Sequence, residues 1–568
     1  MKMKSLMLGA AALLAAAPAF GAGRGSDGQL NLLYWQAPSI MNPYLSSGTK
    51  DLEASSIVIE PLARYNPKGE MIPYLAADIP TVANGGVSKD LMSITWKLKP
   101  GLKWSDGSAV TADDVVFTGE YCMDPKGGCA QLSHFQNVSK IEAVDPLTVK
   151  ITYKQPMPDP YGPFVSYESP ILQKKQFEKC MGAAAPTCTQ ANFNPIGTGP
   201  FEVVNFKPND VIQLKANPNY RDPNKPAFAT VNFKGGGDAA AAARAVFQTG
   251  EYDYAWNLQL SPDVLKGMTG AGAKGKVVAA FGSLVERLEM NLTDPSSSLP
   301  ADERSTAKHP NPILSDKRVR EALSMAIDRN LLVQVGYGAA GKPTCNLVPA
   351  PAAYADENNT GCLKQDIAGA KKLLDEAGWK MGADGFRHKD GKKLVLSYQT
   401  STNAVRQDFQ ALIKQWWKEI GVDTQLRNIN ASVFFGGDPG SPDTFQKFYA
   451  DVEMYANNFS GTDPQTYLSM YTCDKAPRPA TQWQGENINR YCDPAYDKLV
   501  AELGQTADLA KRGELAKKMN DMLTKDTYTI VPLVWRGTTS GVANSIAGED
   551  INPWDSELWN IADWSRKK

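Results

Sequence analysis

Residues 95–107 read TWKLKPGLKWSDG, and residues 110–117 read VTADDVVF. The first stretch lies within an alternation of apolar and polar residues over 91–98, which predicts a half-buried strand. Thr111 can cap a helix that begins in the second stretch, because the two aspartates that follow it lie at the positive end of the helix dipole. A strand, a turn and a capped helix are therefore expected in close succession here.

The segments on either side extend this pattern. Residues 147–153 (LTVKITY) alternate again, which predicts a second strand. From about residue 285, amphipathic helices are expected to alternate with apolar strands. The predicted helices cover 316–327, 366–377, 405–420 and 508–523, and the predicted strands cover 394–398 and 530–535. Such alternation indicates an α/β protein.

The amino terminus has the pattern of a secretory signal. Lys2 and Lys4 precede an apolar run over 6–17, and small residues follow around Ala19 and Ala22. The run is too short to span a bilayer, which needs about 20 apolar residues. We therefore expect residues 1–22 to be a cleaved signal peptide, removed at a position within 19–23, and the mature chain to be periplasmic.

Length and charge narrow the functional classes. A chain of 568 residues is long enough for two to four domains. Its formal net charge is -1 at pH 7, so no basic surplus favours nucleic acid as a partner.

The eight cysteines form four close pairs. Their separations are 7, 8, 17 and 19 residues, for Cys122–Cys129, Cys180–Cys188, Cys345–Cys362 and Cys473–Cys492. An even number in an exported chain indicates disulfides, and we expect the four local pairings among the possible ones. The chain contains no C-x-x-C motif and only three scattered histidines, so we expect no structural metal.

Two motifs suggest chemistry that their context does not support. Residues 336–341 match a dinucleotide fingerprint, but they follow a predicted helix where a strand is required, so we expect no cofactor. Ser47 and Lys50 match the Ser-x-x-Lys pattern of penicillin-recognising enzymes. The partner motifs Ser-Asp-Asn and Lys-Thr-Gly are absent, so an exported serine acylase is the alternative and not the main hypothesis.

Several aromatic residues lie beside amides. Trp256 precedes Asn257, Phe459 follows Asn457 and Asn458, and Trp483 lies shortly before Asn487. Rings and amides together suit a cleft that stacks on a polar solute and hydrogen-bonds it. Each of these residues is equally compatible with a place in the core. Tyr398, at the end of a predicted strand, is a further candidate contact.

Residues 95–107 and 110–117 together resemble the signature of the extracellular solute-binding protein family 5. This family comprises the periplasmic oligopeptide-, dipeptide- and nickel-binding components of ABC importers. Other similar stretches follow in the family's order, at 197–201, 316–329, 370–379, 417–422 and 463–464. The resemblance runs over nearly the whole mature chain.

The resemblance implies an α/β, two-lobed periplasmic-binding-protein fold, of type II in its large three-domain variant, with mixed sheets and a two-strand hinge. We expect lobe I over 23–284, with an extra subdomain at about 64–195. Lobe II is expected over 285–529, and residues 530–568 are expected to return to lobe I. The crossings are placed near 284–291 and 527–535.

The resemblance also implies where a ligand binds. The turn after the first strand, which we predict over 30–35, maps to Ser47, Gly48 and Thr49, and a second loop maps to Asn457, Asn458 and Phe459. Dipeptide binders place an aspartate in that second loop, and this chain lacks it.

The expected function is capture of a peptide or peptide-like solute by hinge closure, without catalysis. A sugar, an opine or another polar solute is the alternative ligand. The expected partners are the solute and an inner-membrane ABC permease, and the protein is expected to be a monomer.

Overall fold

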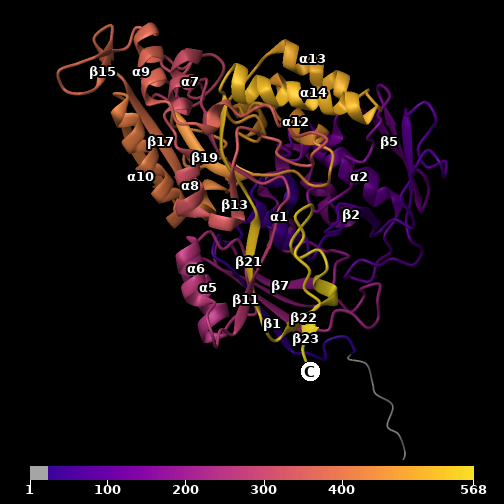
Figure 1. Ribbon diagram of the computed structural model, residues 1–568. Coiled ribbons are helices and arrows are strands. Elements are labelled where there is room, and N and C mark those ends of the chain that lie inside the picture. Colours follow the sequence, from indigo (N-terminus) through magenta and orange to yellow (C-terminus); the bar gives the residue numbers. More distant parts are fainter. Residues whose placement is uncertain (1–22) are drawn as a thin grey trace, which may run out of the picture.

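The computed structural model describes residues 23–568, so the signal peptide predicted for 1–22 lies outside the described residues. Figure 1 shows two main bodies with the carboxyl terminus at the base of one of them. Between residues 23 and 568, none of the helices combines the length and apolar character needed to cross a membrane.

Lobe I is built on a seven-stranded mixed sheet with the order β11-β21-β10-β1-β9-β8-β7. Strand β1 runs parallel to β9 and β10, and the other neighbours are antiparallel. The strands are β1 (Gln29–Tyr34), β7 (Phe201–Lys207), β8 (Val211–Ala216), β9 (Thr230–Gly235), β10 (Tyr254–Ala255), β11 (Gly275–Ala280) and β21 (Thr538–Ala543).

Lobe II contains a six-stranded sheet with the order β13-β20-β12-β19-β17-β18. The strands are β12 (Val285–Met290), β13 (Gly341–Pro343), β17 (Val395–Ser401), β18 (Asp423–Ile429), β19 (Val452–Asn457) and β20 (Ile530–Arg536). Its helices are α7 (Lys317–Met325), α8 (Arg329–Gly336), α9 (Ile367–Glu376), α10 (Ala404–Glu419), α13 (Pro494–Leu503) and α14 (Leu509–Asp521). The predicted alternation of helices and strands is confirmed in this lobe.

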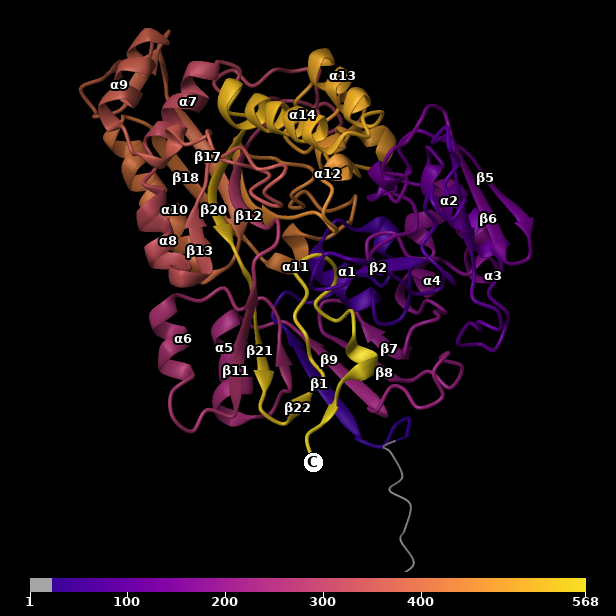
Figure 2. The ribbon, with the colours of Figure 1, turned by 45° about the vertical axis from the view of Figure 1, so that its right-hand side comes forward.

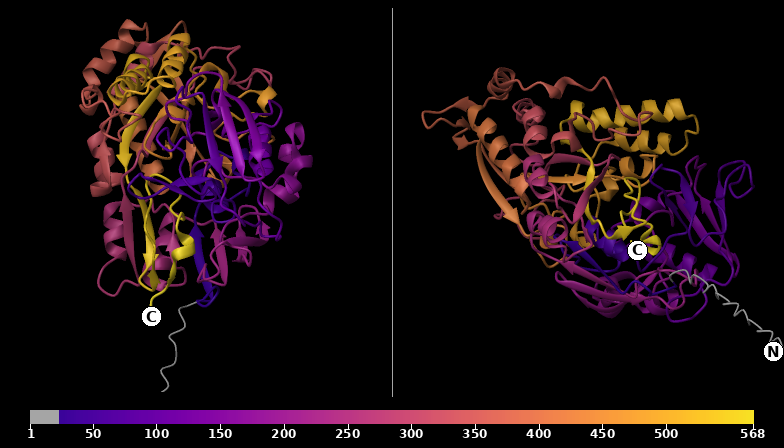
Figure 3. Two further views of the ribbon diagram at one scale, coloured as in Figure 1. Left: turned by 90° about the vertical axis from the view of Figure 1, so that its right-hand side faces the viewer. Right: turned by 60° about the horizontal axis from the view of Figure 1, so that its bottom comes forward.

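The chain passes twice between the two sheets. Residues 281–284 join β11 to β12, and Gly537 alone joins β20 to β21. Strands β20 and β21 therefore run on from one lobe into the other (Figures 1 and 3). Because β20 pairs with β12, the second crossing lies at Gly537 and not at the predicted return near 530. The other domain boundaries stay predictions.

A three-stranded sheet, β4-β6-β5, stands apart from the main sheets. Its strands are β4 (Ser93–Lys97), β5 (Val138–Asp145) and β6 (Thr148–Tyr153), and α2 (Ala112–Met123) packs against β5. In Figure 2 these elements lie at the edge of the molecule opposite α9 and α10.

The signature segment is held by local contacts. The backbone N–H of Thr111 donates to Asp114 at 2.9 Å, which closes the predicted helix cap. The indole of Trp104 donates to the same carboxylate at 3.2 Å, and Trp104 is fully buried. The motif therefore stabilises the extra sheet and its helix.

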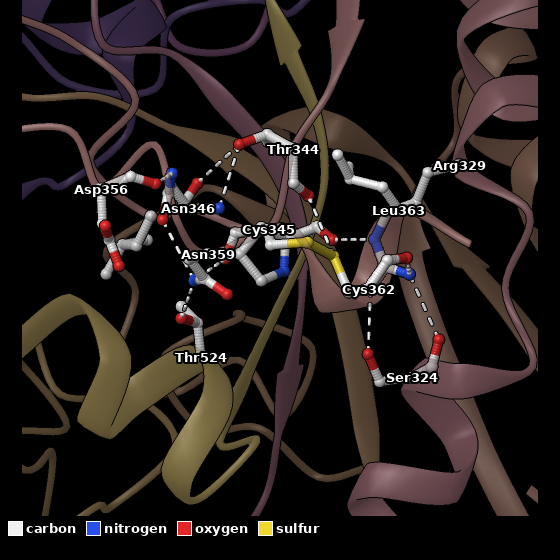
Figure 4. Close-up of a disulfide and its surroundings, with 12 residues drawn as sticks. Ser324, Arg329, Thr344, Cys345, Asn346, Asp356, Asn359, Cys362, Leu363 and Thr524 are labelled. Carbon is white, nitrogen blue, oxygen red and sulfur yellow. Dashed lines mark hydrogen bonds between the residues drawn. A yellow bond between two sulfur atoms is a disulfide. The ribbon is translucent and has the colours of Figure 1, made fainter. Parts of the chain in front are cut away.

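All four predicted local disulfides are present. Cys345–Cys362 joins the segment after β13 to the segment before α9 (Figure 4). The surrounding backbone is held as well, since Arg329 donates to the Cys362 carbonyl at 2.9 Å and Asn359 donates to the Cys345 carbonyl at 3.0 Å.

Candidate functional site

A cavity lies between the lobes, close to both crossings. It encloses about 1230 Å³ of atom-free space, its open mouth included. Lobe I, lobe II and the carboxyl-terminal segment all contribute to its wall. Five of the predicted contacts line it: Ser47, Thr49, Trp256, Asn457 and Asn458.

The first predicted loop is placed by helix α1 (Thr49–Ser55), whose cap is Gly48. A Cβ atom on Gly48 would lie 2.6 Å from the carbonyl oxygen of Phe435 in lobe II. Gly48 is not itself part of the cavity wall, but its missing side chain lets the lobes approach. The Ser47 hydroxyl accepts a hydrogen bond from Gln446 of lobe II at 3.3 Å.

Lobe II supplies an aromatic wall. Phe435, Phe445 and Tyr455 line the cavity and pack edge to face, with ring centroids 5.4 to 6.3 Å apart. Met470 and Ile488 extend the same apolar surface. This wall can bury an apolar or aromatic group of a ligand.

Two arginines lie where the lobes meet. Arg406, in α10, donates through Nε to Glu286 at 2.6 Å. Arg536, at the end of β20, donates to the side chain of Asn257 in lobe I at 3.3 Å. Burial alone would raise the pKa of Glu286, but the two arginines hold it below its usual value. One carboxylate thus serves two guanidinium groups, which leaves positive charge for an anionic group of a ligand.

One donor of this pair is unused. Arg536 Nε lies 3.4 Å from a Glu286 oxygen but makes no hydrogen bond with any residue from 23 to 568. A buried donor without a partner costs about 1–3 kcal/mol, so this atom favours a ligand that supplies an acceptor.

Carboxyl groups form a further part of the polar wall, beside neutral amides and hydroxyls. Five acidic residues line the cavity: Glu53, Glu168, Glu486, Asp555 and Glu557. Asp555 is paired with Arg64 at 3.2 Å, and Glu168 with His134 at 3.2 Å. Glu486 accepts from Ser133, while its second oxygen is buried and has no donor among the described residues. Burial raises the pKa of Glu486.

The match to known proteins agrees with this geometry. The sequence model of the bacterial extracellular solute-binding proteins, family 5, matches residues 70–477. The chain belongs to this family. Its members are periplasmic and deliver small solutes to ABC permeases, and this solute-binding protein is the substrate-binding component of an ABC importer and not an enzyme.

Individual relatives share about a quarter or less of their residues with this chain. The glutathione-binding protein GsiB of Escherichia coli (strain K12) is 26% identical over 472 residues, covering 82% of each chain. The oligopeptide-binding protein AppA of Bacillus subtilis, solved with a nonapeptide, has a TM-score of 0.81 at 22% identity and covers 96% of this chain and 100% of its own. The murein tripeptide binding protein MppA of E. coli has a TM-score of 0.77 at 21% identity, with 96% and 99% covered. These structures show the two-lobed fold.

Three predicted contacts of the solute-binding protein lie elsewhere. Tyr398 is fully buried in the core of lobe II and donates to the sulfur of Met454 at 3.1 Å. Trp483 packs against Tyr449 outside the cavity wall, with ring centroids 6.0 Å apart. Phe459 packs on Tyr467 at 5.2 Å and lines a smaller, separate hollow. The structure therefore does not support these three as ligand contacts, because Tyr398 and Phe459 fill apolar cores and Trp483 packs on Tyr449 away from the cavity.

The acylase alternative also fails on geometry. The Lys50 ammonium lies 2.8 Å from the Asp51 carboxylate and donates to Ser39 at 3.0 Å. It makes no hydrogen bond to Ser47, which the lysine would have to activate. Lys50 thus belongs to a buried ion pair, in agreement with a family of binding proteins.

Sequence reasoning missed most of the charged wall. No motif marks these residues: Arg406 lies in the helix predicted over 405–420, Arg536 directly follows the strand predicted over 530–535, and Glu53 and Glu557 lie outside the predicted elements. The one available signal was charge in two strands: β12 carries Glu286, Arg287 and Glu289 between apolar residues, and Arg536 ends the apolar strand β20.

Proposed function

We propose that this protein is exported to the periplasm and captures a peptide-like, zwitterionic solute between its lobes. It then docks, as a monomer, on an inner-membrane ABC permease. The observation that carries the ligand class is the pair of unused polar atoms in the cavity, Arg536 Nε and the free oxygen of Glu486. A carboxylate suits the first and an ammonium group suits the second, and a peptide carries both.

The relatives support the same ligand class. GsiB is named for glutathione, AppA was solved with a nonapeptide, and MppA is named a murein tripeptide binding protein. A neutral sugar would leave the charged atoms unpaired, so it is the weaker alternative. The carboxylates of the cavity take the place of the missing aspartate in the loop at 457–463.

Closure of the lobes is the proposed mechanism. Contacts already join them, such as the Ser432 hydroxyl to the Ala37 carbonyl at 2.9 Å and Gln446 to Ser47. A ligand between the lobes contacts both walls only in the closed state. It therefore binds the closed state more tightly and shifts the population toward it.

The test is a thermal-shift screen of tripeptides, glutathione, sugars and opines, followed by small-angle X-ray scattering. A peptide-like compound should raise the melting temperature and reduce the radius of gyration. A hit confined to sugars would contradict the ligand class. A complete lack of response to every class would contradict solute capture.

A further inference from the structure

Two cavity carboxyls stand without a cation. Glu53 in α1 is 2% exposed and Glu557 in the carboxyl-terminal segment is 5% exposed, and both line the cavity. Within residues 23–568, no lysine or arginine lies within 4 Å of either carboxylate, whereas the neighbouring Asp555 is paired with Arg64. We call Glu53 and Glu557 the acid pair.

Neutral donors hold the acid pair in place. Glu53 accepts from the Ser556 hydroxyl at 2.6 Å and from the backbone N–H of Glu557 at 3.0 Å. Glu557 in turn accepts from the Ser540 hydroxyl at 2.6 Å and from Tyr254. These bonds orient the carboxyls but bring no positive charge, and buried carboxylates are costly unless a charge is paired with them.

Burial accordingly raises the pKa of Glu53 to about 8, with Glu557 adding to the effect. The pKa of Glu557 is raised as well, chiefly by burial. Glu53 therefore retains a proton near neutral pH, which a bound cation can displace.

The pairing of the other charged groups in the cavity also leaves the acid pair without a cation. Lys50 is neutralised by Asp51, Arg406 and Arg536 share Glu286, and Asp555 is paired with Arg64. Among the described residues, the acid pair and the free oxygen of Glu486 have no basic group within 4 Å, whereas the two guanidinium groups at Glu286 exceed its charge by one. The aromatic wall of Phe435, Phe445 and Tyr455 belongs to the same cavity.

We infer that the solute is an amphipathic cation: its ammonium or guanidinium group binds at the acid pair and its apolar body packs on the aromatic wall. This inference rests on the proposed function and narrows the substrate class. A peptide with a basic side chain and an aromatic residue fits. Glutathione does not, because its two carboxylates outnumber its one ammonium group.

The probes are the tripeptide Phe-Ala-Lys, the same peptide acetylated on the lysine, Phe-Ala-Glu and glutathione, with affinities measured by calorimetry. Phe-Ala-Lys should bind at least tenfold more tightly than its acetylated form, because acetylation removes the charge without removing the chain. The Glu53→Gln and Glu557→Gln variants should reduce this preference to less than about threefold. Glu142→Gln is the matched control, since Glu142 is a half-buried glutamate on β5 of the extra sheet, outside the cavity wall, and its replacement should leave the preference unchanged.

Proton exchange provides a second readout. At pH 7, binding of Phe-Ala-Lys should release protons, seen as a dependence of the apparent enthalpy on the ionisation enthalpy of the buffer. The release should disappear in Glu53→Gln. The other ionisable groups facing the acid pair are Tyr34, Tyr167, Tyr254, Asp555 and Arg536. The tyrosines stay protonated near pH 7, because burial raises the pKa of Tyr34, Tyr167 and Tyr254 further.

The outcomes separate the two proposals. Tighter binding of the acetylated peptide, of Phe-Ala-Glu or of glutathione would overturn the cation inference and leave peptide capture standing. Failure of every peptide in both this set and the wider screen would overturn peptide capture and the inference with it. If Glu53→Gln does not fold, the cation inference is tested in two other ways. One compares Phe-Ala-Lys with its acetylated form on the wild-type protein, and the other repeats that comparison on Glu557→Gln.

Discussion

The Ser133 hydroxyl of lobe I donates a hydrogen bond to the Glu486 carboxylate of lobe II across the cleft. Ser133 lies in a short helix, Leu132–Phe135, beside the extra sheet, and Glu486 lies on the cavity wall. Because the bond joins the two lobes, we expect it to form only in the closed state and to stabilise that state alone.

We therefore expect Ser133→Ala to weaken solute binding. Loss of a hydrogen bond to a charged group costs about 1.5–3 kcal/mol, which corresponds to an affinity at least tenfold lower. Calorimetry with the best solute measures the loss, and scattering should show a more open free protein. Ser298→Ala, at an exposed position, is the control. An unchanged affinity in Ser133→Ala would show that this contact does not contribute to closure.

The acid pair makes stability depend on pH. Glu53 binds its proton more tightly in the folded protein, because its pKa rises from an ordinary 4.5 to about 8. Its contribution is therefore complete below pH 4.5 and is lost as the pH rises toward 8. Relative to Glu53→Gln, the ligand-free wild type should lose up to about 1.4 kcal/mol of unfolding free energy per pH unit in that window. Denaturant titrations at pH 5, 6, 7 and 8 measure this, and parallel curves for the two proteins would contradict it.

Asn458 and Tyr398 were both predicted to contact the ligand, but their replacement should affect solute affinity differently. The Asn458 side chain lines the cavity and makes no hydrogen bond with the described residues, whereas Tyr398 is fully buried in the lobe II core. Asn458→Ala should weaken solute binding by about 1 kcal/mol, or roughly fivefold. Tyr398→Phe should leave the affinity within about twofold. A larger effect of Tyr398→Phe than of Asn458→Ala would reverse the assignment.

The disulfide Cys345–Cys362 should stabilise lobe II by restricting the unfolded chain. Replacing both cysteines by serine is expected to lower the unfolding free energy by about 3 kcal/mol. The Cys180–Cys188 pair spans 8 positions instead of 17, so its removal should cost about 0.6 kcal/mol less in the same chain-entropy relation. Denaturant unfolding of both double variants checks this order. The reverse order would show that native contacts such as Arg329 to Cys362 outweigh loop length.

Part of the site could be predicted because it lies in loops. Ser47, Thr49, Asn457 and Asn458 were assigned from the two ligand-binding loops that the family resemblance implies, and they line the cavity. Tyr398 was misplaced because a strand shows its alternation but not which face meets the ligand. Helix α10 covers the face to which Tyr398 points, since the Tyr398 and Trp417 rings lie 5.6 Å apart, and the sequence gave no sign that Arg406 in this helix reaches the cavity.

Features governed by near neighbours were readable from the amino acids alone: the cap at Thr111, the helix and strand alternation of lobe II and the four close cysteine pairs. The charge pattern of the cavity was decided only by folding. Glu53 and Ser556 are separated by 503 positions, and Arg536 meets Asn257 from 279 positions away. Whether a carboxyl is paired, buried or free depends on such distant partners, because Coulomb energy and desolvation are set by separation in space and not along the chain.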